Sequence, residues 1–343
     1  MKITTTGIDL AKNVLQVHGV TACGKVVLKK QLKRAQVLAF FANLPPCLIG
    51  MEACASAHYW ARQLSALGHT VKLMAPQYVK PYVKTNKHDV ADAEAICEAV
   101  ARPNMRFVAI KTAEQQVLLA VHRARQGLVK ARTAQANQIR GLLGEFGAVV
   151  PQGLGYIAKR LPELLEDGDH ELPSSLRQLL ARLGANLEHL QRQVAELERE
   201  IQRWHQDSAL SQRVAAIPGI GPLSASALVA TVGVARNFRH GRQLAAWLGM
   251  VPKQASSGGK TTLLGISKRG DSYLRTLFIH GARAVVQQAE RHPERADPWL
   301  KQLLGRRPKN VVVVALANKN ARTAWALLAH GRDYQPLHAA TNA

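Results

Sequence analysis

Apolar residues between positions 176 and 204 recur at alternating steps of four and three. They are Leu176, Leu180, Leu183, Leu187, Leu190, Val194, Leu197, Ile201 and Trp204. A 3.5-residue spacing held over about four heptads predicts a coiled-coil seam rather than an ordinary amphipathic helix. The segment must therefore form a long helix that packs on a partner. Either an earlier helix of the same chain or another subunit could supply it.

The earlier helix is predicted over residues 112–144, which are rich in Ala, Gln, Leu and Arg and contain no Pro. Its cations are Arg123, Arg125, Lys130, Arg132 and Arg140. A basic helix is usually a solvated surface, and contact with nucleic acid is the alternative. Residues 150–173 contain several Gly and Pro and the acidic run at 166–169, so we expect a loop-rich connector there.

The N-terminal part is predicted to be an α/β layer fold with a mixed sheet. Short apolar segments indicate strands, and longer periodic ones indicate helices. The expected strands lie at 3–12, 14–20, 25–32, 47–51 and 70–74, and the expected helices at 35–43 and 57–67. Asp9 lies inside the first strand, where a charge is costly unless a cation or a donor compensates it. The simpler alternative is an Asp that ends the strand and caps the next turn.

Three further acids are predicted to join Asp9. Glu52 ends another buried strand, and Asp89 and Asp92 stand three residues apart on a helix, so both face the same side. Grouped carboxylates repel one another, and Mg²⁺ prefers such oxygen ligands. The alternatives are an N-cap for Asp89 and a solvated acid for Asp92. Thr85, Asn86, Lys87 and His88 could contact phosphate, although a polar loop is the simpler interpretation.

The charge balance indicates a polyanionic partner. The 343 residues include 46 Lys plus Arg against 23 Asp plus Glu, giving a net charge of +23 and a pI near 10.4. Nucleic acid is the expected partner. A membrane is not, because no apolar run approaches about 20 residues. The N-terminus has no signal-peptide pattern, and the four Cys form no Cys-x-x-Cys pair. We therefore expect a cytoplasmic protein with reduced thiols and no zinc site.

Two glycine-rich segments stand out after residue 206. Residues 217–222 lie between expected helices and resemble the hairpin of a helix-hairpin-helix motif, with Gly219 and Gly221 letting backbone N–H groups approach a phosphate. A plain turn between helices is the alternative. The second segment places Ser256 and Ser257 before Gly258 and Gly259, which alone suggests a flexible linker. Nearby cations favour a serine that attacks a phosphodiester, namely Lys253, Lys260, Lys268, Arg269 and Arg275.

Taken together, these motifs resemble a known family. The first part resembles a RuvC-like, RNase H-type nuclease domain with an Asp-Glu-Asp-Asp (DEDD) set, which corresponds to Asp9, Glu52, Asp89 and Asp92. Nearly the whole chain resembles the insertion-sequence one-ten family of transposases, which join such a domain to a serine-bearing one. The likeness also rests on the segments 7–9, 217–221, 249–258 and 265–271, and the tail at 315–325 resembles the eleven-eleven subgroup.

The resemblance implies a division into a nuclease domain at 1–110, a helical coiled-coil region at 111–206 and a mainly helical serine transposase domain at 207–343. It also implies Mg²⁺ on the four acids and a nucleophilic serine before a glycine, which maps to Ser257 with Ser256 as a competitor. Further implications are a structured guide (bridge) RNA and active centres shared between subunits. We expect a dimer or tetramer through the coiled coil, because a recombining enzyme must hold two DNA duplexes.

The predicted function is therefore cleavage and rejoining of donor and target DNA by a transposase. Two alternatives stay open at this level. One is a Holliday-junction-type nuclease that uses the acids and water without a covalent serine step. The other is a non-catalytic nucleic-acid-binding scaffold, which the charge alone would permit.

Overall fold

A computed structural model describes residues 2–84, 88–166 and 172–336. The chain forms two compact units, Met1–Gln115 and Gln116–Ala343, which are treated separately below. Thr85, Asn86 and Lys87, named above as possible phosphate contacts, lie outside the described residues, as does most of the acidic run at 166–169.

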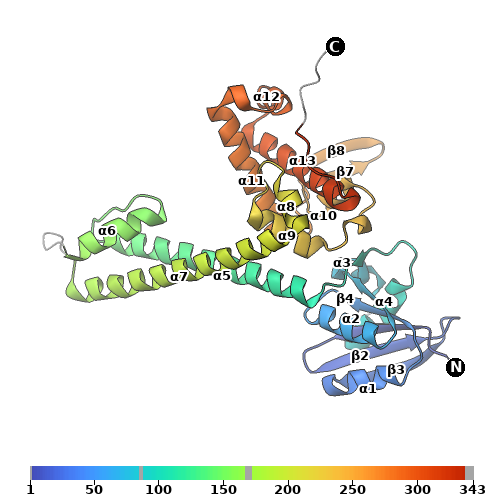
Figure 1. The fold of residues 1–343 in the computed structure, drawn as a ribbon. Helices are drawn as coiled ribbons and strands as arrows, with labels where there is room; N and C mark the ends of the chain where they lie inside the picture. The colour runs from blue at the N-terminus through green and yellow to red at the C-terminus, as the bar shows by residue number, and fades with distance from the viewer. Residues whose placement is uncertain (1, 85–87, 167–171, 337–343) are drawn as a thin grey trace, which may run out of the picture. The chain divides into compact units, whose positions relative to one another are not determined.

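The first unit is built on a six-stranded mixed sheet with the strand order β3-β2-β1-β4-β5-β6 (Figure 1). β1 pairs antiparallel with β2 and parallel with β4, so the predicted mixed α/β fold is confirmed. The strands are β1 (Thr5–Leu10), β2 (Val14–Val20), β3 (Val26–Lys33), β4 (Leu48–Glu52), β5 (Thr70–Met74) and β6 (Phe107–Val108). The helices are α1 (Val37–Ala42), α2 (Ala57–Ala66), α3 (Pro76–Val79) and α4 (Asp89–Val100).

Each face of the sheet has its own core, because side chains alternate along a strand. Ile8, Ile49 and Met51 pack with Phe41 of α1 and Leu64 of α2 on one face. The opposite face, called the α4 face below, packs against α4. Its core contains Met74, Ala95, Ile96, Ala99 and Val100.

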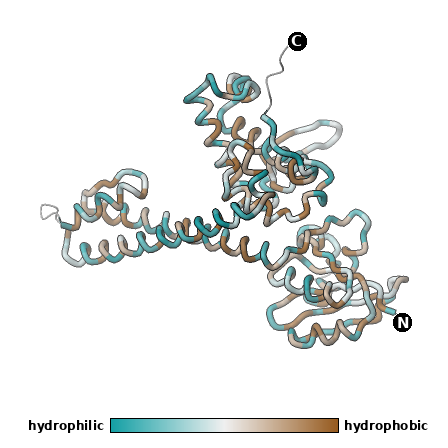
Figure 2. The backbone as a smooth tube through the Cα atoms, viewed as in Figure 1, coloured by the Kyte–Doolittle hydropathy of each residue, from teal (hydrophilic) through white to brown (hydrophobic). Residues whose placement is uncertain are grey.

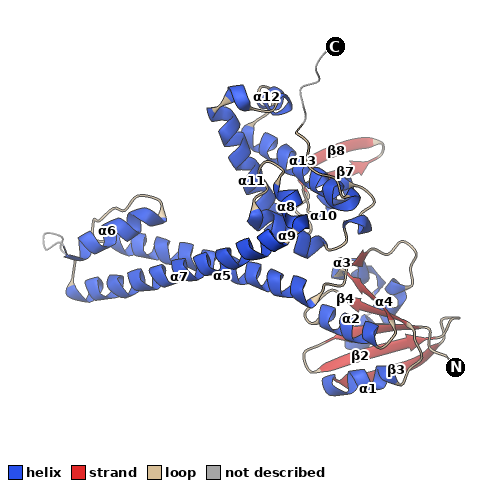
Figure 3. Ribbon diagram, in the orientation of Figure 1, coloured by secondary structure: helices blue, strands red, loops and turns tan. Residues whose placement is uncertain are grey.

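Two long antiparallel helices, called the rod below, are α5 (Ala113–Gly144), nearly all of which belongs to the second unit, and α7 (Ser174–Asp207) (Figure 3). Contacts between them run in opposite directions along the two helices. Arg125 of α5 pairs with Glu198 of α7. Gln135, further along α5, accepts a hydrogen bond from Asn186, which comes earlier in α7. Among the heptad positions of α7, Leu180, Leu187, Val194 and Ile201 are buried. The alternate heptad positions are half-buried, namely Leu183, Leu190 and Leu197. The seam partner is therefore α5 of the same chain. Hydrophilic residues recur along both helices of the rod (Figure 2).

The connector predicted to be loop-rich instead contains a helix, α6 (Leu154–Glu166). Ile157, Leu161 and Leu164 lie on one side of it and are buried against the end of the rod. Pro162 falls between them and does not displace this apolar face. The guanidinium of Arg177 donates to the carbonyl oxygens of Leu164, Leu165 and Leu172 and so satisfies the helix end.

The rest of the second unit is a helical core that carries one β-hairpin. The helices are α8 (Ala209–Ala215), α9 (Pro222–Val232), α10 (Gly241–Trp247), α11 (Ser272–Arg291), α12 (Pro298–Leu304) and α13 (Lys309–His330). Leu316 and Leu327 pack inward, and Trp325 lies half-buried against the same core. The hairpin consists of β7 (Pro252–Ser257) and β8 (Lys260–Ile266). None of the described helices is both long and apolar enough to cross a membrane.

Candidate active site

Asp9 and Glu52 lie on neighbouring parallel strands at the same edge of the sheet. In the register of β1 and β4, Gly7 is opposite Gly50 and Ile8 is opposite Met51. Asp9 and Glu52 come one step further along each strand. They lie two residues after Gly7 and Gly50, which face α4, so both acids point to the α4 face. The strand ends therefore bring two acids 43 positions apart in the sequence into adjacent places.

Two glycines let α4 approach the sheet closely beside these acids. A Cβ on Gly7 would lie 2.3 Å from the carbonyl oxygen of Ala93, and one on Gly50 would lie 2.7 Å from Cβ of Val100. No other residue fits either position without moving the helix. The close approach fixes the height of α4 above β1 and β4.

α4 packs on β1 through the turn from Ala93 to Cys97. The Cys97 thiol donates to the carbonyl oxygen of Thr5, and a Cβ on Gly7 would lie 2.3 Å from the Ala93 carbonyl oxygen and 2.4 Å from the Cys97 backbone nitrogen. Asp89 and Asp92 lie in the first turn of the same helix, just before this contact. The structure therefore brings Asp9 and Glu52 together and holds the helix that carries the other two acids against the same face of the sheet.

Cys54 reports the negative potential at this edge. Burial, followed by the charges of Glu52 and Asp9, raises the pKa of the Cys54 thiol. Within the described residues, no group of three or more His, Cys, Asp or Glu side chains is already assembled to hold a metal ion. The donors themselves suit a hard divalent cation, because carboxylate oxygens are its preferred ligands. Of the four predicted ligands, the structure places Asp9 and Glu52 side by side and does not assemble them with Asp89 and Asp92.

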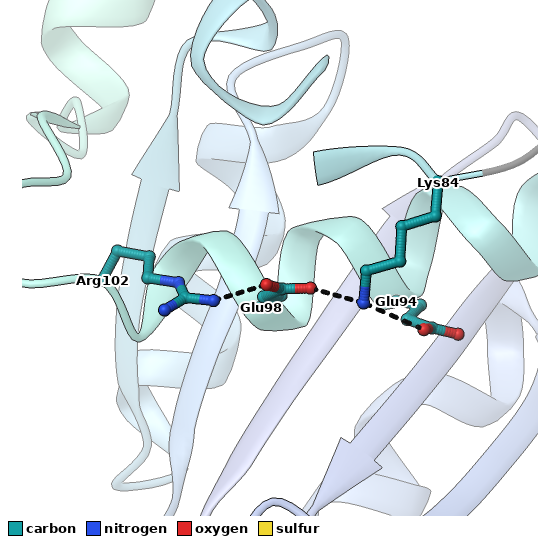
Figure 4. A network of polar contacts seen from close by, with 4 residues as sticks. All are labelled: Lys84, Glu94, Glu98 and Arg102. Carbon is teal, nitrogen blue, oxygen red and sulfur yellow. Dashed lines mark hydrogen bonds and ion pairs between the residues drawn. The ribbon is translucent and has the colours of Figure 1, made fainter. Parts of the chain in front are cut away.

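A line of ion pairs holds the segment before α4 against the helix (Figure 4). Lys84 lies 2.9 Å from Glu98 and 3.8 Å from Glu94, and Arg102 also pairs with Glu98. Hydrogen bonds from Lys84 and Arg102 lower the pKa of Glu98. These partners are largely exposed, so each pair contributes little stability. Their consequence is positional, because Lys84 directly precedes the short segment that leads to Asp89.

The two serines, whose segment taken alone suggested a flexible linker, are part of a β-hairpin. Gly258 and Gly259 form its two-residue turn, with φ angles of +55° and +77°, as a type I′ turn requires. Ser257 is opposite Lys260 in the register, and Ser256 is opposite Thr261. Consecutive residues alternate, so the two serines point to opposite faces of the ribbon. Ser257 shares its face with the Lys260 cation, whereas the Ser256 hydroxyl accepts a hydrogen bond from Gln254 at 2.9 Å.

The base of this hairpin is held firmly although its strands are exposed. A Cβ on Gly249 would lie 2.1 Å from the Arg269 carbonyl oxygen, and one on Gly270 would lie 1.8 Å from that of Trp247. Arg275, predicted to contact nucleic acid, donates from Nη1 to the carbonyl oxygens of Leu248 and Arg269 at 3.1 Å each. This guanidinium therefore fastens the two segments that lead into and out of the hairpin.

The remaining predicted nucleic-acid contacts differ in exposure. Lys253, Lys260, Lys268 and Arg269 are exposed on or beside the hairpin. Gly221 is exposed at the start of α9, whereas Gly219 packs so closely on α11 that a Cβ on it would lie 2.8 Å from the Gly281 carbonyl oxygen. The Pro218 carbonyl oxygen accepts a hydrogen bond from Asn320. The glycine turn is therefore partly used in packing α8 and α9 against α11 and α13.

A buried polar cluster joins the rod to the helical core. The ring nitrogens of His122 on α5 lie 3.0 Å from the Tyr273 hydroxyl and 3.1 Å from the Ser226 hydroxyl. Burial, together with the nearby Arg125 cation, lowers the pKa of His122 to about 4. The neutral ring is thus the form that fits between α9 and α11.

Sequence reasoning missed several residues that shape these sites. Gly50, Lys84, Gly249 and Gly270 act by close packing or by pairing across the fold, and a single sequence carries no local signal for these contacts. His122 resembled an ordinary position on a basic helix. Its place in a heptad of α5, between Leu118 and Arg125, is the one pattern that could have marked it as buried.

Comparison with known proteins gives consistent similarities. A model of the DEDD domain, described as "Transposase", matches residues 6–147, and one described as "Transposase IS116/IS110/IS902 family" matches residues 211–301. A "Probable family 20 transposase" of Pseudomonas aeruginosa is 55% identical, covering 98% of this chain and 100% of the relative. The "Transposase for insertion sequence element IS1328" of Yersinia enterocolitica is 45% identical over 96% and 98% of the two chains. That for IS1111A of Coxiella burnetii is 43% identical over 97% and 92%.

Proposed function

This chain belongs to the IS116/IS110/IS902 family of transposases, and we propose that it cuts and rejoins DNA with a DEDD carboxylate centre and a serine nucleophile. The chain is thus an insertion-sequence transposase with a nuclease domain, and the DEDD domain implies a divalent metal. The observation that supports the proposed centre is the placement of Asp9 beside Glu52 at the ends of β1 and β4, on the face of the sheet against which α4 packs.

The proposed carboxylate set is Asp9, Glu52, Asp89 and Asp92, and the proposed ion is Mg²⁺, which such oxygen donors prefer. A bound Mg²⁺ would polarise the scissile phosphate and stabilise the charge on the leaving oxygen. The two strand acids are fixed by hydrogen bonds on both sides of β1 and β4, whereas Asp89 and Asp92 depend on the position of α4. The chain therefore supplies two fixed ligands and two that adjust.

Ser257 is the proposed nucleophile. Its hydroxyl oxygen bonds to phosphorus as the bond to the leaving deoxyribose oxygen breaks, and the hydroxyl proton passes to solvent while the leaving oxygen gains one. Lys260, opposite Ser257 in the ribbon, lies on the face where the phosphate charge develops. This neighbour favours Ser257 over Ser256, whose face carries Thr261, Gln254 and Leu263. The transient phosphoserine link would then be resolved by strand exchange.

Two partners complete the proposal. The family resemblance supports a structured guide RNA that pairs with donor and target DNA, so that base pairing sets specificity while the protein contacts backbone and shape. An oligomer would unite carboxylates and serine from different subunits. Because α5 already covers the heptad seam of α7, oligomer contacts along the rod would use its remaining surface.

Separate Ser257→Ala and Ser256→Ala variants test the serine step. Labelled element-junction DNA is incubated with the full chain, Mg²⁺ and flanking RNA, and a covalent protein–DNA adduct is sought on a denaturing gel. We expect Ser257→Ala to abolish the adduct and to lower strand exchange by about 10⁴-fold. Ser256→Ala should retain both activities.

The other outcomes are informative as well. Full recombination by both serine variants would contradict the serine mechanism and leave a water-dependent nuclease. Asp9→Asn should remove cleavage and largely retain DNA binding. A scaffold without catalytic activity would instead show no difference between Asp9→Asn and the unmodified chain.

A further inference from the structure

Residues 10–51 of the first unit contain six Lys or Arg and no Asp or Glu. The cations are Lys12, Lys25, Lys29, Lys30, Lys33 and Arg34. Most of them lie in β3 or directly beside it in the sequence. β3 is an edge strand of the sheet, and its residues are nearly all exposed. In the described part of the chain, no carboxylate pairs with Lys29 or Lys33 within 4 Å. Such an uncompensated strip of positive charge fits a polyanion.

The strand register divides these cations between the two faces of the sheet. Gly7, on the α4 face, is opposite His18, and His18 is opposite Lys29. Burial lowers the pKa of His18, and on this face the charge of Glu94 raises it while those of Lys29 and Lys84 lower it. Lys33 follows four residues later and shares the face. Lys30 points the other way, with its ammonium 5.2 Å from the centre of the Phe40 ring.

The same register connects Lys29 and Lys33 to the carboxylate centre. Asp9 is opposite Gln16, and Gln16 is opposite Gln31, so Gln31 lies between the two lysines and in line with Asp9. Neighbouring strands are about 4.8 Å apart, which places the Gln31 backbone about 10 Å from that of Asp9. A long, flexible lysine beside this row can reach a phosphate next to one held at Asp9.

We propose that Lys29, Gln31 and Lys33 form a backbone-binding track for the DNA strand that is cut, called the β3 track. This inference rests on the proposed function, because it assumes that the reacting phosphate lies at Asp9 and Glu52. The lysines bind phosphates flanking the scissile one, and the Gln31 amide donates to a phosphate or sugar oxygen. The contacts carry no base preference, which suits an enzyme whose site is chosen by pairing.

A competing explanation exists for lysines on an edge strand, since they also prevent edge-to-edge aggregation. That role requires charge on the edge but makes no distinction between the two faces. Lys30 therefore provides a matched control, because it has the same charge, strand and exposure but points to the opposite face. Face-dependent DNA binding is the property that separates the β3 track from simple edge protection.

The test measures DNA binding by the full chain carrying Asp9→Asn, which prevents cleavage of the probe. In this background, a Lys29→Gln/Lys33→Gln double variant is compared with a Lys30→Gln variant. Each protein is titrated with labelled single-stranded element-end DNA at several salt concentrations. We expect the double variant to reduce the slope of log affinity against log salt by about 1.4, or about 0.7 for each lost phosphate contact. Lys30→Gln should change it by much less. Photo-cross-linking from bases flanking the cut site should label a peptide of β3.

Three results would overturn the β3 track. The first is an equal salt slope for the double variant and Lys30→Gln. The second is aggregation of the double variant with unchanged DNA binding. The third is a double variant that binds an RNA probe more weakly but binds DNA normally. Cleavage is followed in parallel in chains that retain Asp9. If Asp9→Asn itself cleaves DNA normally, the proposed function fails whatever the slopes show. Unchanged slopes alongside a cleavage-dead Asp9→Asn reject only the track.

Discussion

The carboxylates and the serine are held in opposite ways. Asp9 and Glu52 stand near the ends of two inner strands of a six-stranded sheet, and two glycines on these strands let α4 pack closely on the same face. Ser257 lies at the end of an exposed two-stranded ribbon that is fixed only at its base. An isolated hairpin is marginally stable, whereas a packed sheet is rigid. We infer that changes near the acids act through the stability of the first unit, whereas changes in the hairpin act on chemistry alone.

The largest expected effect comes from filling the contact between β1 and α4. Gly7→Ala places a Cβ 2.3 Å from the Ala93 carbonyl oxygen, which must displace the helix that carries Asp89 and Asp92. We expect the first unit to lose about 3 kcal/mol of unfolding free energy, together with DNA cleavage. Denaturant titration combined with hydrogen exchange of the α4 amides measures this loss.

Gly141→Ala is the matched control, because a Cβ on this residue of α5 would meet nothing within 4 Å. The same chemical change should therefore stabilise its helix by about 0.5–1 kcal/mol. If Gly7→Ala unfolds like the unmodified chain, the sheet does not set the position of α4, and the contrast between the two centres is lost.

The next effect is confined to the second unit and depends on pH. The pKa of His122 is about 4 in the folded chain against 6.5 for an unperturbed histidine, so the unfolded chain binds more protons between these values. The stability of the His122 cluster is complete above pH 6.5 and falls as the pH drops toward 4, by about 3 kcal/mol in total. Urea titrations from pH 4 to 7 measure it.

His122→Gln should flatten this dependence, and His280→Gln, at an exposed position on α11, should leave it unchanged. A steep slope that survives in His122→Gln would assign the proton uptake to other groups. Unfolding of the first unit, followed separately by hydrogen exchange of β1 and β4, should not show the His122 contribution.

The sequence predicted the parts of the fold that depend on local periodicity. The spacing of apolar residues predicted the strands around Asp9 and Glu52, the helix at Asp89 and the heptads of α7. The structure contains all of these elements. Their partners are not local properties. That α5 rather than another subunit covers α7 depends on how the chain folds back through α6, which Pro162 and neighbouring glycines made resemble a loop.

The candidate sites show the same division. Asp9 and Glu52 could be named because a charge in or at the end of a buried strand is costly, and Asp89 and Asp92 because they stand three residues apart on a helix. The close approach of α4 required two glycines 43 positions apart, and Gly50 has no pattern of its own. The hairpin was missed for a different reason. Ser-Ser-Gly-Gly is typical of flexible linkers, and only the pairing of residues 252–257 with 260–266 shows that the glycines make a turn.

The smallest expected effect on stability comes from the turn that presents Ser257. Gly259 has a φ of +77° and open space around it, so Gly259→Ala costs about 1 kcal/mol of local strain without a clash. Because the ribbon is exposed, this strain should shift the hairpin and reduce the Ser257–DNA adduct severalfold while global unfolding stays unchanged. Gly24→Ala is the control, since Gly24 has a φ of +80° and equally open space in the turn between β2 and β3. If adduct formation falls equally in both variants, the geometry of the hairpin does not position the nucleophile. The contrast between the carboxylates and the serine would then fail.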